Sequence, residues 1–527
     1  MKLQTIYILA SVIMLMAFAS CKKDLLKTNT DPNAVSVDVF DPNNILSATQ
    51  LYYTGSTNNA IEVEETEFEG AGCFIQHFAS LSFYGDKYLI NNGAWSAFFD
   101  NVYPSAVKYA VDLYTTTSGK PQYKNLHQIS RIMKALVFQR ITDVYGDVPY
   151  SQAGLGYHNS VFFPAYDKQQ DIYTDMLKEV SQAVDSLDEN ADKPVGDLFY
   201  STSDDQIAEW KKFGNSFLLR LAMRLTKVDP ATAQKYVKQV LGKTMTSNDD
   251  NAIVAHDTND PLSINRLFRG IGEDGAVQLS LQVSDTFVAA LKDDPRLPIY
   301  TFFWDPTWAP PLTPDNPPVG TADTSQIRGL PNGYDASTGP HGLPVSQPGF
   351  LANVNLYARI NPLILNPTAP SLVLTYAETE LLLADAAQRW GIVGTEDAGT
   401  AYNNGVTAAM SQLSVYGDGG TISGDDIMTY LGAHPYSPAN GLNLINTQYW
   451  LTTFCDEYEA WSNFRRTGYP ALIPVSGYPS SQSNGAIPHR MQYSTNDKQV
   501  NPTNYNTAVS RLTGGDKITS RVWWDIQ

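Results

Sequence analysis

Cysteine is scarce in this 527-residue chain, which has only three, at positions 21, 73 and 455. So few cysteines exclude the small folds that depend on a network of disulfides, and a chain of this length can bury a large apolar core instead. Cys73 and Cys455 either form one disulfide in an oxidising compartment or are two free buried thiols, and the sequence leaves both interpretations open.

Positive charge is also in short supply. Charged residues make up 17% of the chain, and 36 Lys and Arg face 54 Asp and Glu, for a net charge of -18. This balance excludes nucleic acid as a partner, because phosphates require a basic surface. It also argues against binding to an anionic lipid face. Beyond the N-terminal segment there is no apolar run long enough to span a bilayer, so we expect the remainder to be soluble.

The common enzyme and metal motifs are missing. There is no Gly-x-Ser-x-Gly and no His-Glu-x-x-His, and the seven histidines lack the spacing of zinc ligands. Residues 270–275 match a dinucleotide-binding pattern, but no clear strand precedes them and Glu273-Asp274 would repel a pyrophosphate. We therefore expect no catalytic residue, no metal and no cofactor. A pair of catalytic carboxylates for glycoside hydrolysis is an alternative that the sequence leaves open, because the distance between two such groups is set by the fold and not by their spacing in the sequence.

The N-terminus is the most informative segment that is present. Met1-Lys2 precedes an apolar run that ends at Phe18, and Ala19-Ser20-Cys21 follows. A basic start, a short apolar run and small residues are typical of a secretory signal, and a Cys directly after them is typical of a bacterial lipobox. We predict a signal peptide over 1–20, a lipidated Cys21 and a polar tether over 21–42. An ordinary signal peptide with a chance Cys is the alternative.

Helical periodicity dominates residues 43–527, which we expect to be one domain. Apolar side chains recur at three- and four-residue steps, and small residues mark the positions where helices would cross. This pattern predicts a mostly α fold with a few short strands, built on a tetratricopeptide-like scaffold of about four helical pairs. The expected pairs are 103–117 with 125–145, 168–188 with 207–226, 371–390 with 396–413, and 425–432 with 443–464.

Two stretches interrupt the helical pattern. Ten prolines lie between Trp304 and Phe350, too many for helix interiors or sheet ladders, so we expect an irregular insertion over about 297–360. A second irregular segment covers about 470–527. Loops of this length in compact proteins are usually functional or disordered, and the aromatic side chains favour order here. Those aromatics are Phe302, Phe303, Trp304, Trp308, Tyr334 and Phe350.

Aromatic and amide side chains on these irregular segments suit a carbohydrate. A sugar ring has an apolar face of C–H groups and a rim of hydroxyls, so binding needs a flat ring beside amides or carboxylates. For any single aromatic residue the alternative is packing in the core. The candidate ligand-binding residues are Tyr84, Tyr88, Asn91, Asn92 and Trp95 in the segment 83–99, with Trp304 and Trp308 in the insertion.

Arg465 and Arg466 lie near the end of an expected helix, before Thr467-Gly468. One interpretation is an anion site. We favour the other, in which both arginines pair with carboxylates inside the scaffold, because the rigid guanidinium fork suits carboxylates. The candidate partners are Glu378, Glu380 and Asp143.

Four stretches, in the same order along the chain, resemble one family. They are the lipobox with Asn-Thr-Asp-Pro-Asn at 29–33, Ile-Thr-Asp-Val-Tyr-Gly-Asp-Val-Pro-Tyr at 141–150, the helix of 376–387, and Trp-Ser-Asn-Phe-Arg-Arg-Thr-Gly-Tyr-Pro at 461–470 with 487–491 and 522–525. Together they resemble the SusD/RagB outer-membrane lipoproteins, in particular the SusD-like branch. Two positions depart from the family pattern: Ser494 stands where Pro is usual, and Phe464 where Glu is common.

The resemblance implies a helical tetratricopeptide scaffold with irregular insertions, lipid-anchored on the outer surface of the outer membrane. It implies a lid over a SusC-like TonB-dependent transporter barrel, which captures oligosaccharides and passes them on without acting as an enzyme. A RagB-like protein that captures peptides is the alternative within the family. A secreted glycan hydrolase and a structural protein that only gates its barrel partner are the alternatives outside it.

Overall fold

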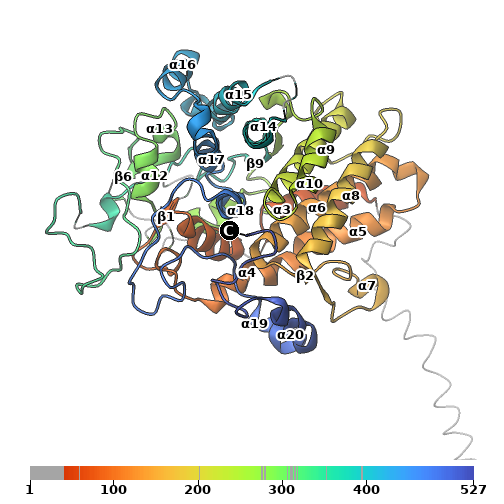
Figure 1. The fold of residues 1–527 in the computed structure, drawn as a ribbon, viewed down its shortest axis with the longest axis horizontal. Coiled ribbons are helices and arrows are strands. Elements are labelled where there is room, and N and C mark those ends of the chain that lie inside the picture. Colours follow the sequence, from red (N-terminus) through yellow and green to blue (C-terminus); the bar gives the residue numbers. More distant parts are fainter. Residues whose placement is uncertain are drawn as a thin grey trace, which may run out of the picture. The chain divides into compact units, whose positions relative to one another are not determined.

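Helices form the scaffold of this protein (Figure 1). The computed structural model describes residues 41–526 except 58–59, 201, 274–276, 278–279, 306, 309–312, 314–315, 317–318, 352, 393 and 395. The expected signal peptide, Cys21 and nearly all of the expected tether lie outside the described residues. Residues 43–527 form one unit. No helix in the described part of the chain has the length and apolarity needed to cross a bilayer.

The secondary structure agrees with the predicted mostly α fold with short strands. The longer helices are α3 (Asn43–Tyr53), α4 (Asn92–Val102), α5 (Lys108–Thr117), α6 (Lys124–Tyr145), α8 (Gln169–Ser186), α9 (Gln206–Arg224), α10 (Pro230–Val240), α14 (Tyr376–Trp390), α15 (Ala398–Ser411), α16 (Gly424–Ala433), α17 (Gly441–Thr452), α18 (Glu457–Thr467) and α20 (Pro502–Arg511). Shorter helices are α7 (Gly156–Asn159), α12 (Asp285–Ala290), α13 (Leu297–Tyr300) and α19 (Thr495–Val500).

The strands are short and antiparallel. β1 (Phe78–Ala79) pairs with β5 (Gln282–Val283), β2 (Val148–Pro149) with β3 (Tyr166–Asp167), and β4 (Ala252–Val254) with β9 (Ser371–Leu374). β6 (Thr301–Trp304) lies between β7 (Gly320–Thr321) and β8 (Arg359–Ile360). The last sheet lies within the insertion, and backbone hydrogen bonds from Val283 to Ala358 at 2.8 Å and from Leu330 to Val283 at 2.9 Å join the insertion to β5.

Three of the four expected helical pairs are present. α5 packs against α6, α8 against α9, and α14 against α15, and α6 also packs against α8. The expected helix 103–117 begins as a π-helical segment, Tyr103–Val107, and continues as α5. The periodicity predicted these pairs because each helix carries one apolar face and must bury it against a neighbour. Local signals set the ends: Thr375 caps α14, and Gly391 ends it with a φ of +63°.

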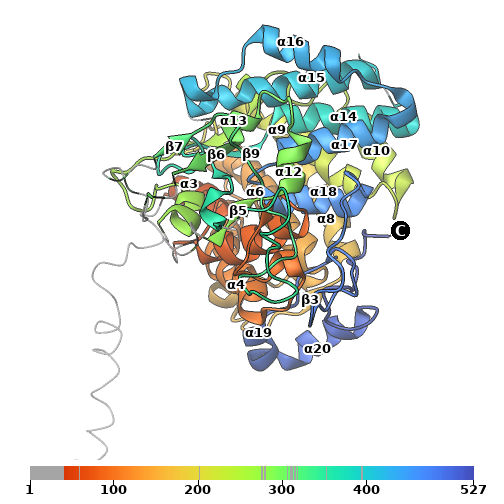
Figure 2. The ribbon, with the colours of Figure 1, turned by 90° about the vertical axis from the view of Figure 1, so that its left-hand side faces the viewer.

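The fourth expected pair is wrong. The run 443–464 is not one helix, because α17 ends at Thr452 and α18 begins at Glu457, with Cys455 between them at a φ of +73°. α17 packs against α14 and α18, while α16 packs against α15. Figure 2 shows these helices as successive layers, α16, α15, α14, α17 and α18. No Gly or Pro marks the break, so the sequence carries no punctuation there.

Several helices were not predicted. These include α3, α4, α19, α20 and the ten-residue π-helix η1 (Val63–Gly72). α4 falls within 83–99, the segment expected to be irregular. Its aromatic run Trp95–Phe99 is buried against η1 and α18 rather than displayed on a loop. Aromatic content therefore indicated core packing in this segment, the alternative stated above.

The cysteines are two free thiols. Cys73 is buried and Cys455 is partly buried, and they do not form a disulfide. Burial raises the pKa of both thiols well above the ordinary value. Both are therefore protonated at neutral pH, as buried structural cysteines commonly are.

Buried ion pairs join the helical layers. Arg220 of α9 donates to Glu378 of α14 at 2.6 Å, and Arg224 donates to Asp143 of α6 at 3.1 Å. Glu459 of α18 accepts from Arg224. Each of these side chains is at most 7% exposed. The pairs link four helices, so they are structural rather than part of a ligand site.

Arg465 and Arg466 lie inside the scaffold as expected, but with other partners. Arg466 pairs with Asp385 at 3.1 Å. Arg465 donates to three backbone carbonyls, and its guanidinium carbon lies 3.8 Å from the ring centre of Trp461 and 4.8 Å from that of Trp524. The expected partners Glu378 and Asp143 are taken by arginines of α9, a helix whose packing against α14 and α6 the sequence does not reveal.

A buried carboxyl on η1 makes the stability depend on pH. Burial raises the pKa of Glu67 from 4.5 to about 8, although Arg140 opposes the shift. Between these two values the folded chain holds a proton that the unfolded chain has lost, so the free energy of unfolding falls as the pH rises. We expect Glu67→Gln to flatten this fall in denaturant titrations from pH 5 to pH 8.5. The exposed control Glu189→Gln should keep the wild-type slope, and equal slopes in all three proteins would contradict the assignment.

Candidate functional site

Three irregular segments that are far apart in sequence meet on one surface. They are residues 80–88, which follow β1, residues 330–350 of the insertion, and residues 473–482 of the C-terminal segment. We call this the three-segment surface. In Figure 1 the insertion and the C-terminal segment both lie on the side of the scaffold that carries β1. The segments interlock through side chains of the first one, which is therefore the base of the site.

Asp86 and Lys87 hold the insertion in place. Lys87 Nζ lies 2.7 Å from Asp86 Oδ1, and the two side chains are 3% and 1% exposed. Lys87 Nζ also donates to the carbonyl of Tyr334 at 3.1 Å, and Asp86 accepts from the backbone N–H of Gly333 at 3.2 Å. Burial raises the pKa of Asp86, and Lys87 offsets only part of that shift. A buried pair with this many hydrogen bonds preorganises the loop above it.

Gly333 allows the insertion to approach the C-terminal segment. Its φ is +88°, and a Cβ atom there would lie 2.6 Å from Cγ1 of Val475. A side chain at this position would collide with Val475 and would also strain the backbone. The close approach brings the second and third segments into direct contact.

Tyr88 fixes the C-terminal segment. Its side chain is fully buried, its hydroxyl accepts from the backbone N–H of Val475 at 3.2 Å, and its carbonyl accepts from that of Gln482 at 3.2 Å. Burial raises the pKa of Tyr88 to about 12, so the phenol keeps its proton at neutral pH. Tyr88 is thus a support beneath the site.

Removing the Tyr88 hydroxyl should loosen this segment. We expect Tyr88→Phe to lower the free energy of unfolding by about 0.5–1.5 kcal/mol, the usual contribution of one hydrogen bond. Hydrogen exchange at residues 473–482 should become faster. Tyr157→Phe, at a tyrosine that is 86% exposed, is the matched control and should change neither quantity. Unchanged exchange in Tyr88→Phe would show that the hydroxyl does not hold the segment.

Partly exposed rings lie on the three-segment surface. Tyr84 precedes the one-turn helix η2 (Gly85–Lys87) and is 43% exposed. Tyr334 and Phe350 pack edge to face with ring centres 5.6 Å apart, and the rings of His341 and Tyr478 lie 5.1 Å apart. These rings come from all three segments, so each segment contributes an apolar face to the surface.

Polar groups accompany the rings. Tyr478 donates its hydroxyl proton to Asp335 Oδ2 at 2.7 Å. Hydrogen bonds from Ser337 and Tyr478 lower the pKa of Asp335, so this carboxylate is ionised at neutral pH. An aromatic face beside a carboxylate and phenolic hydroxyls can bind a ligand that has both apolar C–H groups and hydroxyls. In the described part of the chain, no group of three His, Cys, Asp or Glu side chains is placed to hold a metal ion.

The structure corrects three of the seven candidate binding residues. Tyr88, Trp95 and Trp304 are at most 1% exposed, so their rings offer no face to a ligand from solvent. Trp95 packs edge to face against Phe74 at 5.5 Å, in the core formed by α4 and η1. Trp304 lies in β6 and donates its indole N–H to the carbonyl of Ile360 at 3.3 Å. The short sheet of the insertion buries Trp304, and the pairing of its strands depends on contacts that local sequence patterns do not reveal.

The other four candidate residues are at least partly exposed to solvent. Tyr84 lies on the three-segment surface. Asn91 caps α4 by accepting from the backbone N–H of Ala94 at 3.3 Å, and Asn92 is exposed. Trp308 packs edge to face on Trp304 at 4.8 Å, and its indole N–H finds no partner among the described residues. These residues remain proposals, with Tyr84 best placed.

Sequence reasoning missed the contribution of the C-terminal segment. His341 and Tyr478 were not candidates, while Tyr334 and Phe350 were taken only as a sign of order in the insertion. The available signal was Tyr478-Pro479 in a Gly- and Ser-rich stretch, an aromatic on a loop without helical periodicity. Which loops meet depends on tertiary packing around Asp86, Lys87 and Tyr88, which no local pattern reveals.

Comparison with known proteins identifies the class. The chain belongs to the SusD-like family, whose model, described as starch-binding associating with outer membrane, matches residues 32–494. This confirms the resemblance found in the sequence. The family is one of carbohydrate-binding proteins rather than enzymes, and its description associates its members with the outer membrane.

Solved structures share the fold. A chitin-binding protein is 32% identical, with a TM-score of 0.77 over 92% of this chain and 100% of the other. A Bacteroidetes SusD-like protein is 24% identical, with a TM-score of 0.79 over 93% of this chain and 100% of the other. A chitin-binding SusD homolog from Flavobacterium johnsoniae is 21% identical, with a TM-score of 0.73 over 92% of this chain and 99% of the other. Among curated protein sequences, none matches this chain.

Proposed function

We propose that this protein is a lipid-anchored outer-membrane protein that captures oligosaccharides on the three-segment surface and passes them, chemically unchanged, to a SusC-like TonB-dependent transporter. The observation that supports capture at this surface is that the buried Asp86–Lys87 pair and Tyr88 hold together three segments, each of which carries a partly exposed tyrosine, namely Tyr84, Tyr334 and Tyr478. Family membership supports a carbohydrate as the ligand.

Oligomers of N-acetylglucosamine are the ligands to test first. The 32% identical relative is named a chitin-binding protein. Chitin is such a polymer, and its sugar rings present the C–H faces that aromatic side chains bind. In this proposal, Asp335 and the hydroxyl of Tyr84 bind the polar groups at the rim of a sugar ring.

The proposal is tested by calorimetric titration of the chain without residues 1–21. The ligands are oligosaccharides of several linkages and a peptide library, and the ligand is recovered and analysed by chromatography afterwards. We expect saturable binding of a glycan that is recovered intact. A cleaved product would indicate a hydrolase, binding of peptides alone would indicate a RagB-like protein, and no binding at all would leave only the gating role.

Lipidation at Cys21 is a separate prediction. A diacylglycerol on a cysteine thiol anchors a protein to a membrane without the need for a membrane-spanning helix. We therefore expect the wild-type protein to partition into detergent and the Cys21→Ala variant to stay in the aqueous phase, with both proteins measured in cells that process the signal. A wild-type protein that carries no lipid by mass spectrometry would contradict the anchor. Copurification of wild-type protein with a transporter barrel tests the partner.

A further inference from the structure

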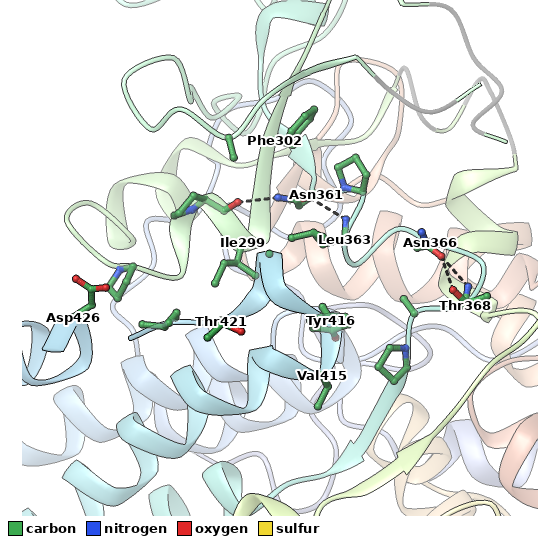
Figure 3. A pocket seen from close by; sticks show the side chains of 18 residues that line it. Ile299, Phe302, Asn361, Leu363, Asn366, Thr368, Val415, Tyr416, Thr421 and Asp426 are labelled. Carbon is green, nitrogen blue, oxygen red and sulfur yellow. Dashed lines mark hydrogen bonds between the residues drawn. The ribbon is translucent and has the colours of Figure 1, made fainter. Parts of the chain in front are cut away.

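A cavity of about 990 Å³ opens between the insertion and the helical scaffold (Figure 3). It lies between the segment of α13 and β6, the loop 361–370, and residues 415–426 after α15. None of its lining residues belongs to the three-segment surface. Its volume is at the upper end of the range of about 300–1,000 Å³ that is usual for small-molecule sites.

The walls of this cavity are apolar and stiff. Pro295, Pro298, Pro362 and Pro370 line it, and each proline has a fixed φ. Aliphatic side chains and two aromatic rings complete the walls. Those shown in Figure 3 are Ile299, Phe302, Leu363, Val415 and Tyr416. Because the walls are rigid, the cavity exists before a ligand arrives, and binding requires little ordering.

Apart from Asn361, the polar side chains with labels in Figure 3 lie toward the two ends. Figure 3 shows Asn366 and Thr368 at one end and Asp426 at the other. The amide oxygen of Asn366 accepts from the backbone N–H of Thr368 at 3.0 Å and from its hydroxyl at 2.9 Å. These two bonds orient the amide and leave its Nδ2 as a donor with no partner among the described residues. Asn361 is held more tightly, because its Nδ2 donates to the carbonyl of Pro298 at 2.8 Å and its Oδ1 accepts from the backbone N–H of Leu363 at 2.9 Å.

The opposite end accepts hydrogen bonds. Asp426 is exposed and accepts from the hydroxyl of Ser423 at 2.6 Å. Thr421 lines the cavity beside it and is also exposed. A carboxylate and a hydroxyl together suit the hydroxyl groups of a ligand. The cavity therefore combines an amide donor, an apolar middle and an acceptor end.

We propose that this cavity binds a short segment of a captured glycan in which at least one sugar carries an N-acyl group, such as a 2-acetamido sugar. The acyl methyl group lies against the aliphatic walls, the acyl carbonyl accepts from Nδ2 of Asn366 at one end, and hydroxyls of another sugar of the segment bond Asp426 and Thr421 at the other end. A plain hexose would leave the apolar walls in water, and a purely apolar ligand would make no hydrogen bond with Asp426 or Asn366, which are both exposed. The inference rests on the proposed glycan capture and adds a second subsite that selects for acylated sugars.

The test compares two oligomers of equal length and linkage, one of N-acetylglucosamine and one of glucose, by calorimetry. Asn366→Ala removes the donor, and Thr421→Trp fills the cavity from an exposed position. We expect each variant to lose about tenfold of the preference for the acetylated oligomer, the effect of losing one hydrogen bond and its apolar contacts. Affinity for the glucose oligomer should stay unchanged, and so should the thermal unfolding midpoint. The exposed control Asn259→Ala should keep the wild-type preference.

The outcomes separate this inference from the proposed function. If the wild-type protein prefers the acetylated oligomer and both cavity variants keep that preference, the cavity does not bind the acyl group. If the wild-type protein shows no preference, the inference also fails. In either case, the proposed function can still hold. If Tyr84→Ala lowers the affinity for both oligomers, the three-segment surface is still supported as the capture site. If the wild-type protein binds neither oligomer, the proposed function fails and this inference fails with it.

Discussion

Tyr84→Ala is expected to weaken oligosaccharide binding at least tenfold while the free energy of unfolding stays within about 1 kcal/mol of wild type. The ring is 43% exposed, so removing it takes little apolar area out of the core. It also removes the most accessible aromatic face of the three-segment surface. Calorimetric titration gives the affinity, and urea denaturation gives the free energy of unfolding.

A matched control makes this result specific. Tyr157 is also a tyrosine, is 86% exposed and lies on α7, outside the three segments. Tyr157→Ala should therefore leave the affinity unchanged. If both variants bind as tightly as wild type, Tyr84 does not contact the ligand. If both lose affinity equally, the effect belongs to the general surface and not to this site.

Asp385→Ala is expected to lower the free energy of unfolding by about 3–5 kcal/mol, because it leaves the buried Arg466 without its carboxylate partner. Asp385 is fully buried and pairs with Arg466 at 3.1 Å and with Arg389, and it also accepts from Asn446 at 2.9 Å. Burial alone would raise the pKa of Asp385, but the two arginines outweigh burial and lower it. Its contribution is therefore complete above the ordinary pKa of 3.8 and is lost as the pH falls below it.

An aspartate on the surface provides the comparison for this second prediction. Asp425 is exposed in the first turn of α16, where a carboxylate contributes about 0.3–1 kcal/mol through the helix dipole. Urea denaturation at pH 7 should therefore show a small loss for Asp425→Ala and a large loss for Asp385→Ala. Similar losses in the two variants would mean that the buried pair does not hold α14 and α18 together.

Helix pairing could be predicted from the sequence where apolar periodicity and end signals agree. α14 is the clearest case, since Thr375 caps it and Gly391 ends it. The prediction failed between α17 and α18, where apolar residues continue through a break that has neither Gly nor Pro. Periodicity reports which residues face a core, and it does not report which neighbouring helix supplies that core.

The sequence could predict which segments carry the candidate site, but it could not predict which of their side chains are exposed. Proline density and aromatic content identified the insertion, and Tyr84 was among the candidates. Trp304 and Trp308 have the same composition signal, yet Trp304 is 1% exposed beneath the sheet of the insertion while Trp308 is only partly buried. Tyr478 joins the site because Tyr88 holds the C-terminal segment against residues 80–88. Such differences arise from contacts between distant segments, which a local pattern does not contain.

The most direct test of capture at the three-segment surface is a crystal structure of the chain without residues 1–21, soaked with an N-acetylglucosamine oligomer. We expect an intact oligomer with one sugar ring stacked on Tyr84 and hydroxyl groups near Asp335. Ligand density only at another place on the protein, or a cleaved oligomer, would contradict the account.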